Sequence, residues 1–246
     1  MNLGKIVALR AKPVVTLTAS AAVLSFTRSV AQAFDLVPRQ EGEVALSNKA
    51  CLTSDCFSLS PLIESVESLV DSSTGTRSSL FVDTQDTAND YGVLKFSTRD
   101  VGTSSSEGYW FRPVAFNEHG TAIEGGRLEV GTFRFTFAEV LETLTVSWFD
   151  AEKRGGTSYI AEIMTTHGIA SDSDDVPNGR NGNTFTRQFN SVQSITLNLG
   201  GRQGGTGDGV SFQISTERVP EPSLLMGAAV AAVMGGVARH KQKASV

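Results

Sequence analysis

The feature that most constrains the fold is a series of short segments, from Ser78 onward, in which apolar and polar residues alternate. Successive side chains of a β-strand point to opposite faces, so this alternation predicts half-buried strands. Clusters of Gly, Ser, Asn and Asp separate the segments, and no long stretch has the period of an amphipathic helix. The pattern predicts an all-β fold, specifically an antiparallel β-sandwich of jelly-roll or lectin-like form. The expected strands are residues 78–83, 91–98, 108–116, 127–137, 143–150, 157–165, 183–189, 193–199 and 208–215.

One expected strand, residues 127–137, predicts a register in detail. Its apolar residues stand at even positions before Gly131, whereas Phe133, Phe135 and Phe137 stand at odd positions. Since the side-chain period of a strand is two, a β-bulge at Gly131 is needed to keep one face inward. Matching inward rows are expected at Leu144, Val146 and Trp148, at Ile195, Leu197 and Leu199, and at Val210, Phe212 and Ile214.

Two other stretches leave alternatives open. Residues 61–70 carry apolar side chains at helical spacing and are compatible with a short helix or with a strand. In the aromatic triplet Tyr109-Trp110-Phe111, alternation turns at least one ring outward, where Trp110 could stack on a sugar face. Core packing with one exposed ring is the simpler interpretation.

The N-terminus is typical of a secretory signal peptide. Three basic residues between positions 5 and 12 precede an apolar stretch at 13–26, and Ala31-Gln32-Ala33 matches a small-residue cleavage site. Cleavage after Ala33 would make Phe34 the new N-terminus. The alternative, an N-terminal membrane anchor, needs a longer and less interrupted apolar stretch.

The C-terminus combines a stiff spacer, a short apolar segment and a basic end. Pro220 and Pro222 favour extended backbone, and residues 224–238 form an uncharged apolar run of 15 residues. As a helix this run would be about 22 Å long, shorter than the roughly 30 Å of a bilayer core. We expect a short transmembrane helix whose basic end stays in the cytoplasm; a buried core helix is the alternative.

This arrangement resembles the C-terminal sorting signal of PEP-CTERM proteins, which a membrane-embedded enzyme, the exosortase, recognises. The resemblance implies a bacterial exported protein whose tail is removed or exchanged after export. The residues that carry the resemblance are Val219, Pro220, Glu221, Pro222, Arg239 and Lys241.

A second resemblance covers residues 125–215. The motifs Gly125-Gly126-Arg127-Leu128-Glu129-Val130-Gly131-Thr132-Phe133, Trp148-Phe149-Asp150-Ala151-Glu152 and Gly207-Asp208-Gly209-Val210-Ser211-Phe212 resemble the LEVG-type subgroup of PEP-CTERM proteins, which is common in cyanobacteria. The resemblance implies a location and a fold, and it carries over neither an activity nor catalytic residues.

The chain therefore divides into a signal peptide (1–33), an extracellular β-sandwich domain (34–218) and a sorting signal (219–246). Seven of the 21 basic residues lie in the two end segments, so the central domain is strongly acidic. Such a domain repels nucleic acid phosphates, and no nucleic acid partner is expected. Cys51 and Cys56 are expected to pair in an oxidising compartment, with two free thiols as the alternative.

Acidic residues at strand ends and in turns are weak candidates for a calcium site, because Ca²⁺ prefers carboxylate and carbonyl oxygens. The alternative is that they cap turns and keep strand edges soluble. The loop at 172–183 departs from the EF-hand pattern at its fifth and twelfth positions. The candidates are Asp150, Glu152, Asp172, Asp174, Asp175 and Asp208.

The sequence shows no motif for catalysis. It lacks G-x-S-x-G and H-E-x-x-H, and the central domain has only two histidines. The glycine-rich stretch 200–209 lies between two strands, whereas a phosphate cradle needs a following helix. A carboxylate pair for glycoside hydrolysis, Asp150 with Glu152 or Glu129, is a weaker alternative.

We therefore expect a non-enzymatic surface or extracellular-matrix protein without a cofactor, exported from a Gram-negative-type bacterium and first anchored in its inner membrane. Its expected partners are signal peptidase, exosortase and an exopolysaccharide. The alternative is a lectin-like glycan-binding module assisted by calcium.

Overall fold

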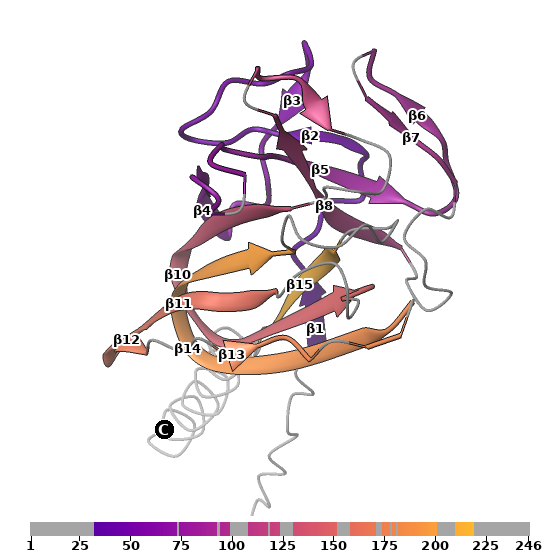
Figure 1. Cartoon of the computed structure of the whole chain (residues 1–246). Coiled ribbons are helices and arrows are strands. Elements are labelled where there is room, and N and C mark those ends of the chain that lie inside the picture. The colour runs from indigo at the N-terminus through magenta and orange to yellow at the C-terminus, as the bar shows by residue number, and fades with distance from the viewer. Residues whose placement is uncertain are drawn as a thin grey trace, which may run out of the picture. The chain divides into compact units, whose positions relative to one another are not determined.

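The computed structural model of the chain describes one β-rich body (Figure 1). The described residues are 32–72, 74–92, 94–98, 108–117, 119–123, 130–151, 158–170, 174–177, 179–180, 182–200 and 210–218. These ranges contain strands and no helix, so the predicted all-β class is confirmed. No helix of membrane-spanning length and hydropathy occurs within them.

Strands within these ranges are named in chain order, and most of them are short. They are β1 (Gln32–Asp35), β2 (Gly42–Val44), β3 (Cys56–Phe57), β4 (Ile63–Leu69), β5 (Ser79–Thr84), β6 (Asn89–Asp90), β7 (Lys95–Phe96), β8 (Tyr109–Phe116), β9 (Ala122–Ile123), β10 (Gly131–Phe149), β11 (Tyr159–Thr165), β12 (Gly168–Ala170), β13 (Asp174–Asp175), β14 (Thr184–Leu199) and β15 (Ser211–Arg218). Residues 61–70, compatible with helix or strand in the sequence, form β4.

One large sheet joins 13 of these strands in the order β12-β11-β14-β10-β15-β8-β5-β2-β3, with β1, β4, β9 and β13 attached at its sides. The strand pairs are antiparallel, except that β2 and β3 run parallel. The remaining two strands, β6 and β7, form a separate hairpin.

The sheet is organised by β10 and β14, which pair along most of their length and curve together (Figure 1). The first half of β10 pairs with β4 on its other edge, and the second half pairs with β15. Pairing between β10 and β14 shifts register between Thr136 and Leu141, where Ser191 of β14 has a φ of 55°. Residues 131–137 and 143–149, which belong to two separate predicted strands, are thus parts of one bent strand.

The predicted bulge at Gly131 is wrong. Gly131 is the first residue of β10 and pairs in register with Leu199. The register shifts lie after Thr136 instead, towards both β4 and β14. Gly131 is needed for space, because a Cβ there would lie 2.5 Å from the Phe133 ring and 2.9 Å from Ser78 Cβ.

The inward row of phenylalanines is confirmed, since Phe133, Phe135 and Phe137 are buried in the main core. Phe135 lies in the first half of β10, and Phe212 pairs opposite the second half of the same strand. Their rings are 5.9 Å apart, and both contact Phe111 of β8. The bend in β10 therefore brings the inner faces of its two halves together.

A second, smaller core lies on the other face of β5 and β8. Phe81 and Val114 pack there against Leu94 and Phe96, which belong to the β6–β7 hairpin and its turn. Both faces of these two strands are covered, so β5 is buried at every position. Trp110 is fully buried as well, so the alternative of an exposed Trp110 that stacks on a sugar face is wrong.

Candidate functional site

A polar surface lies on the outer side of β4, β10, β14 and β11, opposite the phenylalanine core. Two cross-strand rows of side chains cover it, which we call the Arg134 face. The first row is Glu67, Arg134, Thr196 and Glu162, and the second is Ser65, Thr136, Ser194 and Met164. In the first half of β10, before the register shift, the even positions therefore build this face and the odd positions build the core.

Arg134 lies at the centre of the first row between two carboxylates. Its Nη2 is 3.5 Å from Glu162 Oε1 and its Nη1 is 3.9 Å from Glu67 Oε2. Its Nε donates to Thr196 Oγ1 at 3.3 Å. Since Thr196 is itself buried, the guanidinium is held against the sheet while a third of its side-chain surface, 37%, stays exposed.

The Arg134 face is hollowed. A depression of about 310 Å³ is lined by seven of its eight residues together with Gln193. Among the residues that line it, Ser194 is buried, whereas Arg134, Glu67 and Glu162 are half-buried. The hollow thus has a hydroxyl-bearing floor and a charged rim.

A buried polar network continues the face beyond Arg134. Asp71 Oδ2 accepts hydrogen bonds from Thr132 Oγ1 at 3.0 Å and from Asn198 Nδ2 at 3.3 Å. Asn198 Nδ2 also lies 2.8 Å from Thr132 Oγ1. Thr132 and Asn198 pair across β10 and β14, two residues along from Arg134 and Thr196. These contacts fix the strands that carry the hollow.

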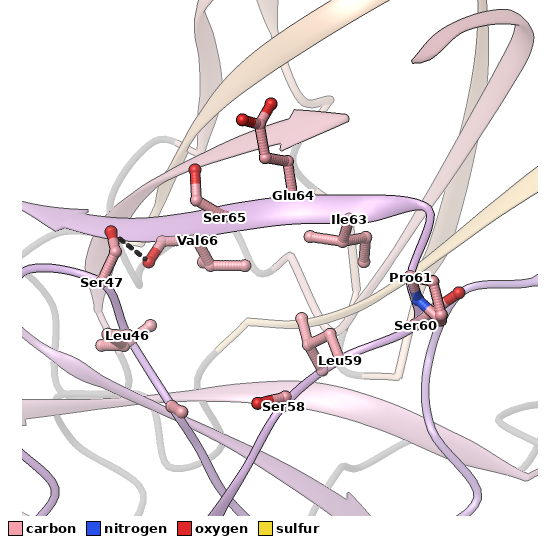
Figure 2. A pocket seen from close by; sticks show the side chains of 11 residues that line it. Leu46, Ser47, Ser58, Leu59, Ser60, Pro61, Ile63, Glu64, Ser65 and Val66 are labelled. Carbon is pink, nitrogen blue, oxygen red and sulfur yellow. Dashed lines mark hydrogen bonds between the residues drawn. The ribbon is translucent and has the colours of Figure 1, made fainter. Parts of the chain in front are cut away.

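A second hollow, of about 230 Å³, lies beside β4 and is mainly apolar. Leu46 and Leu59 face Ile63 and Val66 across it, whereas Glu64 points to the opposite side of the strand (Figure 2). Ser47 closes one end by donating through its N and Oγ to the Val66 carbonyl. Four serines and Glu64 line the hollow, and no histidine is among its lining residues.

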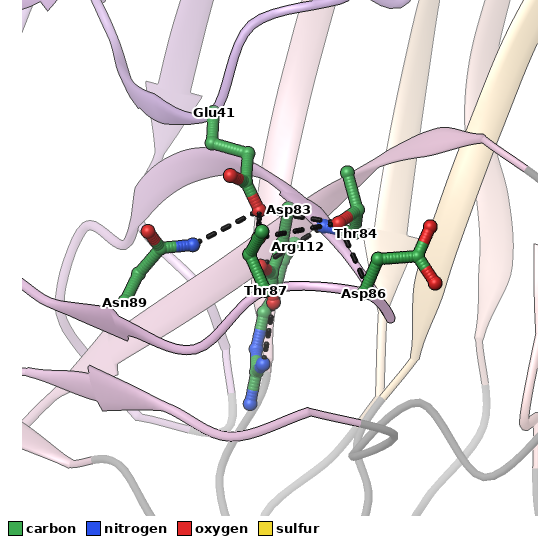
Figure 3. A network of polar contacts seen from close by, with 7 residues as sticks. All are labelled: Glu41, Asp83, Thr84, Asp86, Thr87, Asn89 and Arg112. Atoms are coloured by element: carbon green, nitrogen blue, oxygen red, sulfur yellow. Dashed lines mark hydrogen bonds and ion pairs between the residues drawn. The ribbon is translucent and has the colours of Figure 1, made fainter.

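A polar network ties the start of the domain to the β5–β6 connection (Figure 3). Glu41 Oε1 accepts from Asn89 Nδ2 at 3.0 Å, from Thr84 Oγ1 at 3.3 Å and from the hydroxyl of Thr87. Below it, Arg112 Nη1 donates to Asp83 Oδ2 at 2.8 Å. Most of these side chains form hydrogen bonds with another member of the network, which indicates a structural role.

The phenol of Tyr91 packs beside this network. Burial, with the nearby carboxylates of Asp83 and Glu41, raises the pKa of Tyr91 from 10.0 to about 12, although the charge of Arg112 opposes the rise. The ring of Tyr91 contacts Phe81 and Phe96 at centroid distances of 5.1 and 5.4 Å. Tyr91 is thus neutral at physiological pH.

Cys51 and Cys56 are joined by a disulfide, with their Cα atoms 6.1 Å apart. The loop that they close surrounds the buried carboxylate of Glu43, whose Oε2 accepts from Leu52 N and Thr53 N, each at 2.7 Å. Glu43 and the two sulfurs are close enough to hold a metal ion, but disulfide sulfurs are not the thiolates that bind metals. The cluster is therefore a structural clasp.

The calcium candidates that lie among the described residues do not form a cluster able to hold a metal ion. Asp150 is buried with a φ of 57°, and its Oδ1 accepts from Gly182 N at 2.6 Å. Asp175 lies in β13 and is exposed, and Asp174 is its neighbour in that strand. Glu152, Asp172 and Asp208 lie outside the described residues.

The sorting and cleavage residues lie at or beyond the limits of the description. Ala33 belongs to β1, where it pairs with Glu217, and Ala31 lies outside the described residues. So do the sorting-signal residues Val219, Pro220, Glu221, Pro222, Arg239 and Lys241. The two histidines of the domain, His119 and His167, are exposed in two different hairpin turns.

Sequence reasoning did not single out Arg134, Glu67 or Glu162. The sequence does indicate the direction of Arg134, because it stands at an even position between two inward phenylalanines and must face outward. The two carboxylates come from strands far away in the sequence, and their approach depends on the register of β4 and β11.

No protein-family model and no curated protein matches the sequence. Among solved structures, the chain is similar to the enzymatically active domain of tailspike protein 4 of bacteriophage CBA120, with 14% identity and a TM-score of 0.31. The match covers 66% of this chain and 22% of the tailspike chain. A similarity at this level carries no argument about fold or activity.

Proposed function

We propose that this chain is an exported surface or extracellular-matrix protein without catalytic activity, sorted by an exosortase through its C-terminal tail. The observation that carries the proposal is the pairing of two end segments: a signal-peptide pattern at 1–33 and a spacer, apolar run and basic end at 219–246. The two patterns occur independently, and a sorting tail has a role only on an exported chain.

The start of the described body supports this processing. Cleavage after Ala33 would leave Phe34 and Asp35 to pair with Thr216 and Ser215 of β15. The next residue, Leu36, is buried and donates its N–H to the Ile214 carbonyl at 2.9 Å. A domain that begins at Phe34 therefore loses the pairs of Gln32 and Ala33 with β15 and keeps those of Phe34 and Asp35, together with the Leu36 contact.

N-terminal sequencing of the protein released from the cell tests export, and Phe34 is the expected first residue. An intact Met1 on mature protein would contradict the proposal. Replacing both prolines of the tail, P220A with P222A, should leave the protein associated with the inner membrane. The same fractionation of P38A, a proline outside the tail, provides the control.

The second candidate function is a lectin-like glycan-binding module on a β-sandwich of jelly-roll type. The Arg134 face favours it, because a hollow lined by hydroxyls, carboxylates and a guanidinium offers the hydrogen-bonding groups that sugars need. The bend of β10, which brings Phe135 and Phe212 into contact, is compatible with a sandwich. An exopolysaccharide of the matrix is the proposed partner.

Calcium assistance is a separate part of this second candidate. A ligand that binds only the folded state at a hundredfold excess over its Kd stabilises that state by about 2.7 kcal/mol. Millimolar Ca²⁺ should then raise the melting temperature of the full chain, and D150N should abolish the rise. An unchanged melting temperature would remove calcium from the proposal and leave glycan binding in place.

A further inference from the structure

We propose that the Arg134 face binds a neutral, hydroxyl-rich oligosaccharide, and that it does so without a metal ion. This inference rests on the second candidate function and specifies its site and ligand class. It is carried by three observations: the order of charges across the strands, the spacing of those charges, and the hollow in which they lie.

The charges alternate across the sheet in the order carboxylate, guanidinium, carboxylate, from Glu67 through Arg134 to Glu162. Neighbouring strands lie about 4.8 Å apart, so the row from β4 to β11 spans roughly 14 Å. That length suits a short chain of sugar rings better than a single ion. The second row adds the hydroxyls of Ser65, Thr136 and Ser194 alongside.

The spacing leaves these groups with hydrogen-bonding capacity. The contact from Arg134 to Glu67, at 3.9 Å, is longer than a hydrogen bond, and the contact to Glu162, at 3.5 Å, is at the limit. A guanidinium carries five N–H donors, and each carboxylate oxygen has two lone pairs. A ligand hydroxyl can donate to a carboxylate and accept from the guanidinium at the same time, so adjacent hydroxyls of a sugar match the row.

The charge balance selects the class of sugar. Two carboxylates face one guanidinium, so the row has a net charge of −1 (one positive and two negative groups). Uronic acids and sulfated sugars are repelled by such a row. A neutral sugar meets no such penalty, and it forms charge-assisted hydrogen bonds with both signs of charge.

Arg134 also removes the need for calcium at this face. In a cation-assisted site, the ion lies between carboxylates and polarises the sugar hydroxyls. Here the guanidinium takes that position, held by Thr196 Oγ1 at 3.3 Å. Met164, half-buried at the β11 end of the second row, supplies apolar surface for a ring face.

The test uses the purified full chain and its R134K and E162Q variants. R134K keeps the charge and loses the planar donor fork, whereas E162Q keeps the shape and loses the charge. E142Q, the same change at an exposed position of β10 outside the face, is the matched control. The probes are maltotetraose, cellotetraose, mannotetraose, tetragalacturonate and tetralysine, each titrated with and without EDTA.

We expect binding of at least one neutral tetrasaccharide that EDTA does not change. R134K and E162Q should each weaken it about tenfold, the loss expected from one charge-assisted hydrogen bond, while E142Q binds as the parent does. All variants should melt at the parent temperature, because the changed side chains are on the outer surface.

Each other outcome overturns the inference in a distinguishable way. Neutral-sugar binding that R134K and E162Q leave unchanged places the glycan site elsewhere and keeps the second candidate function. Binding of tetragalacturonate alone, or loss of binding in EDTA, keeps a glycan-binding function with a different ligand chemistry. Binding of tetralysine alone, or of no probe, overturns the inference and the glycan-binding candidate together.

Discussion

Arg112 Nη1 lies 2.8 Å from Asp83 Oδ2, and the two side chains expose only 2% and 0% of their surface. The guanidinium carbon also lies 4.1 Å from the centre of the Phe96 ring. An ion pair of opposite charges is therefore enclosed between the β5–β8 strands and the β6–β7 hairpin. Removing one member leaves the other charge buried alone, which costs far more than the pair itself contributes.

We expect R112A to lower the free energy of unfolding by about 3–5 kcal/mol. The double variant D83L/R112M should lose much less than the sum of the losses of D83L and R112M, because no charge remains buried. A denaturant-based double-mutant cycle measures this difference. Additive losses would mean that the two groups act independently of each other.

The raised pKa of Tyr91 predicts an alkaline loss of stability. The unfolded chain releases the phenol proton near 10.0, whereas the folded chain retains it to about 12. The unfolded state loses the proton first. The contribution of Tyr91 to the free energy of unfolding is therefore complete below pH 10.0 and declines as the pH rises to about 12. We expect Y91F to lose less stability than the parent across this interval, as measured by urea melts. Parallel curves for the two proteins would refute the assignment.

Phe135 and Thr136 are adjacent in β10 and face opposite sides of the sheet. Phe135 is fully buried against Phe111 and Phe212, so F135A should cost about 3–5 kcal/mol. Thr136 is half-buried in the second row of the Arg134 face, and T136A should cost well under half as much. Similar, small losses in a denaturant melt would show that the odd positions in the first half of β10 do not form the core.

The clasp formed by Glu43 and the disulfide predicts a coupled loss of stability. E43A leaves the N–H groups of Leu52 and Thr53 without their acceptor, at a cost of about 1–3 kcal/mol. C51S/C56S removes the short closed loop, which is worth about 2 kcal/mol by chain entropy. Because both changes release the same loop, the combined variant should lose less than the sum. Thermal melts of the three variants measure the coupling, and strict additivity would contradict it.

Local patterns in the sequence were sufficient to predict the class of fold and one row of its core. Alternation places Phe133, Phe135 and Phe137 on one face, because the side-chain period of a strand does not depend on its neighbours. The same rule places Arg134 on the opposite face. The short spacing of Cys51 and Cys56 likewise predicts their pairing with little reference to the rest of the chain.

Tertiary pairing decided the features that alternation does not encode. Residues 131–149 form one bent strand rather than two, because β14 continues to pair with β10 on both sides of the register shift at Thr136 and Leu141. Trp110 is buried rather than exposed, because the fold packs it against Phe149 at the end of β10, a contact that alternation within one strand does not predict. The Arg134 face arises in the same way. Its carboxylates, Glu67 and Glu162, are ordinary exposed acids in the sequence, and they flank a guanidinium only because long-range hydrogen bonding aligns β4 and β11 with β10 and β14.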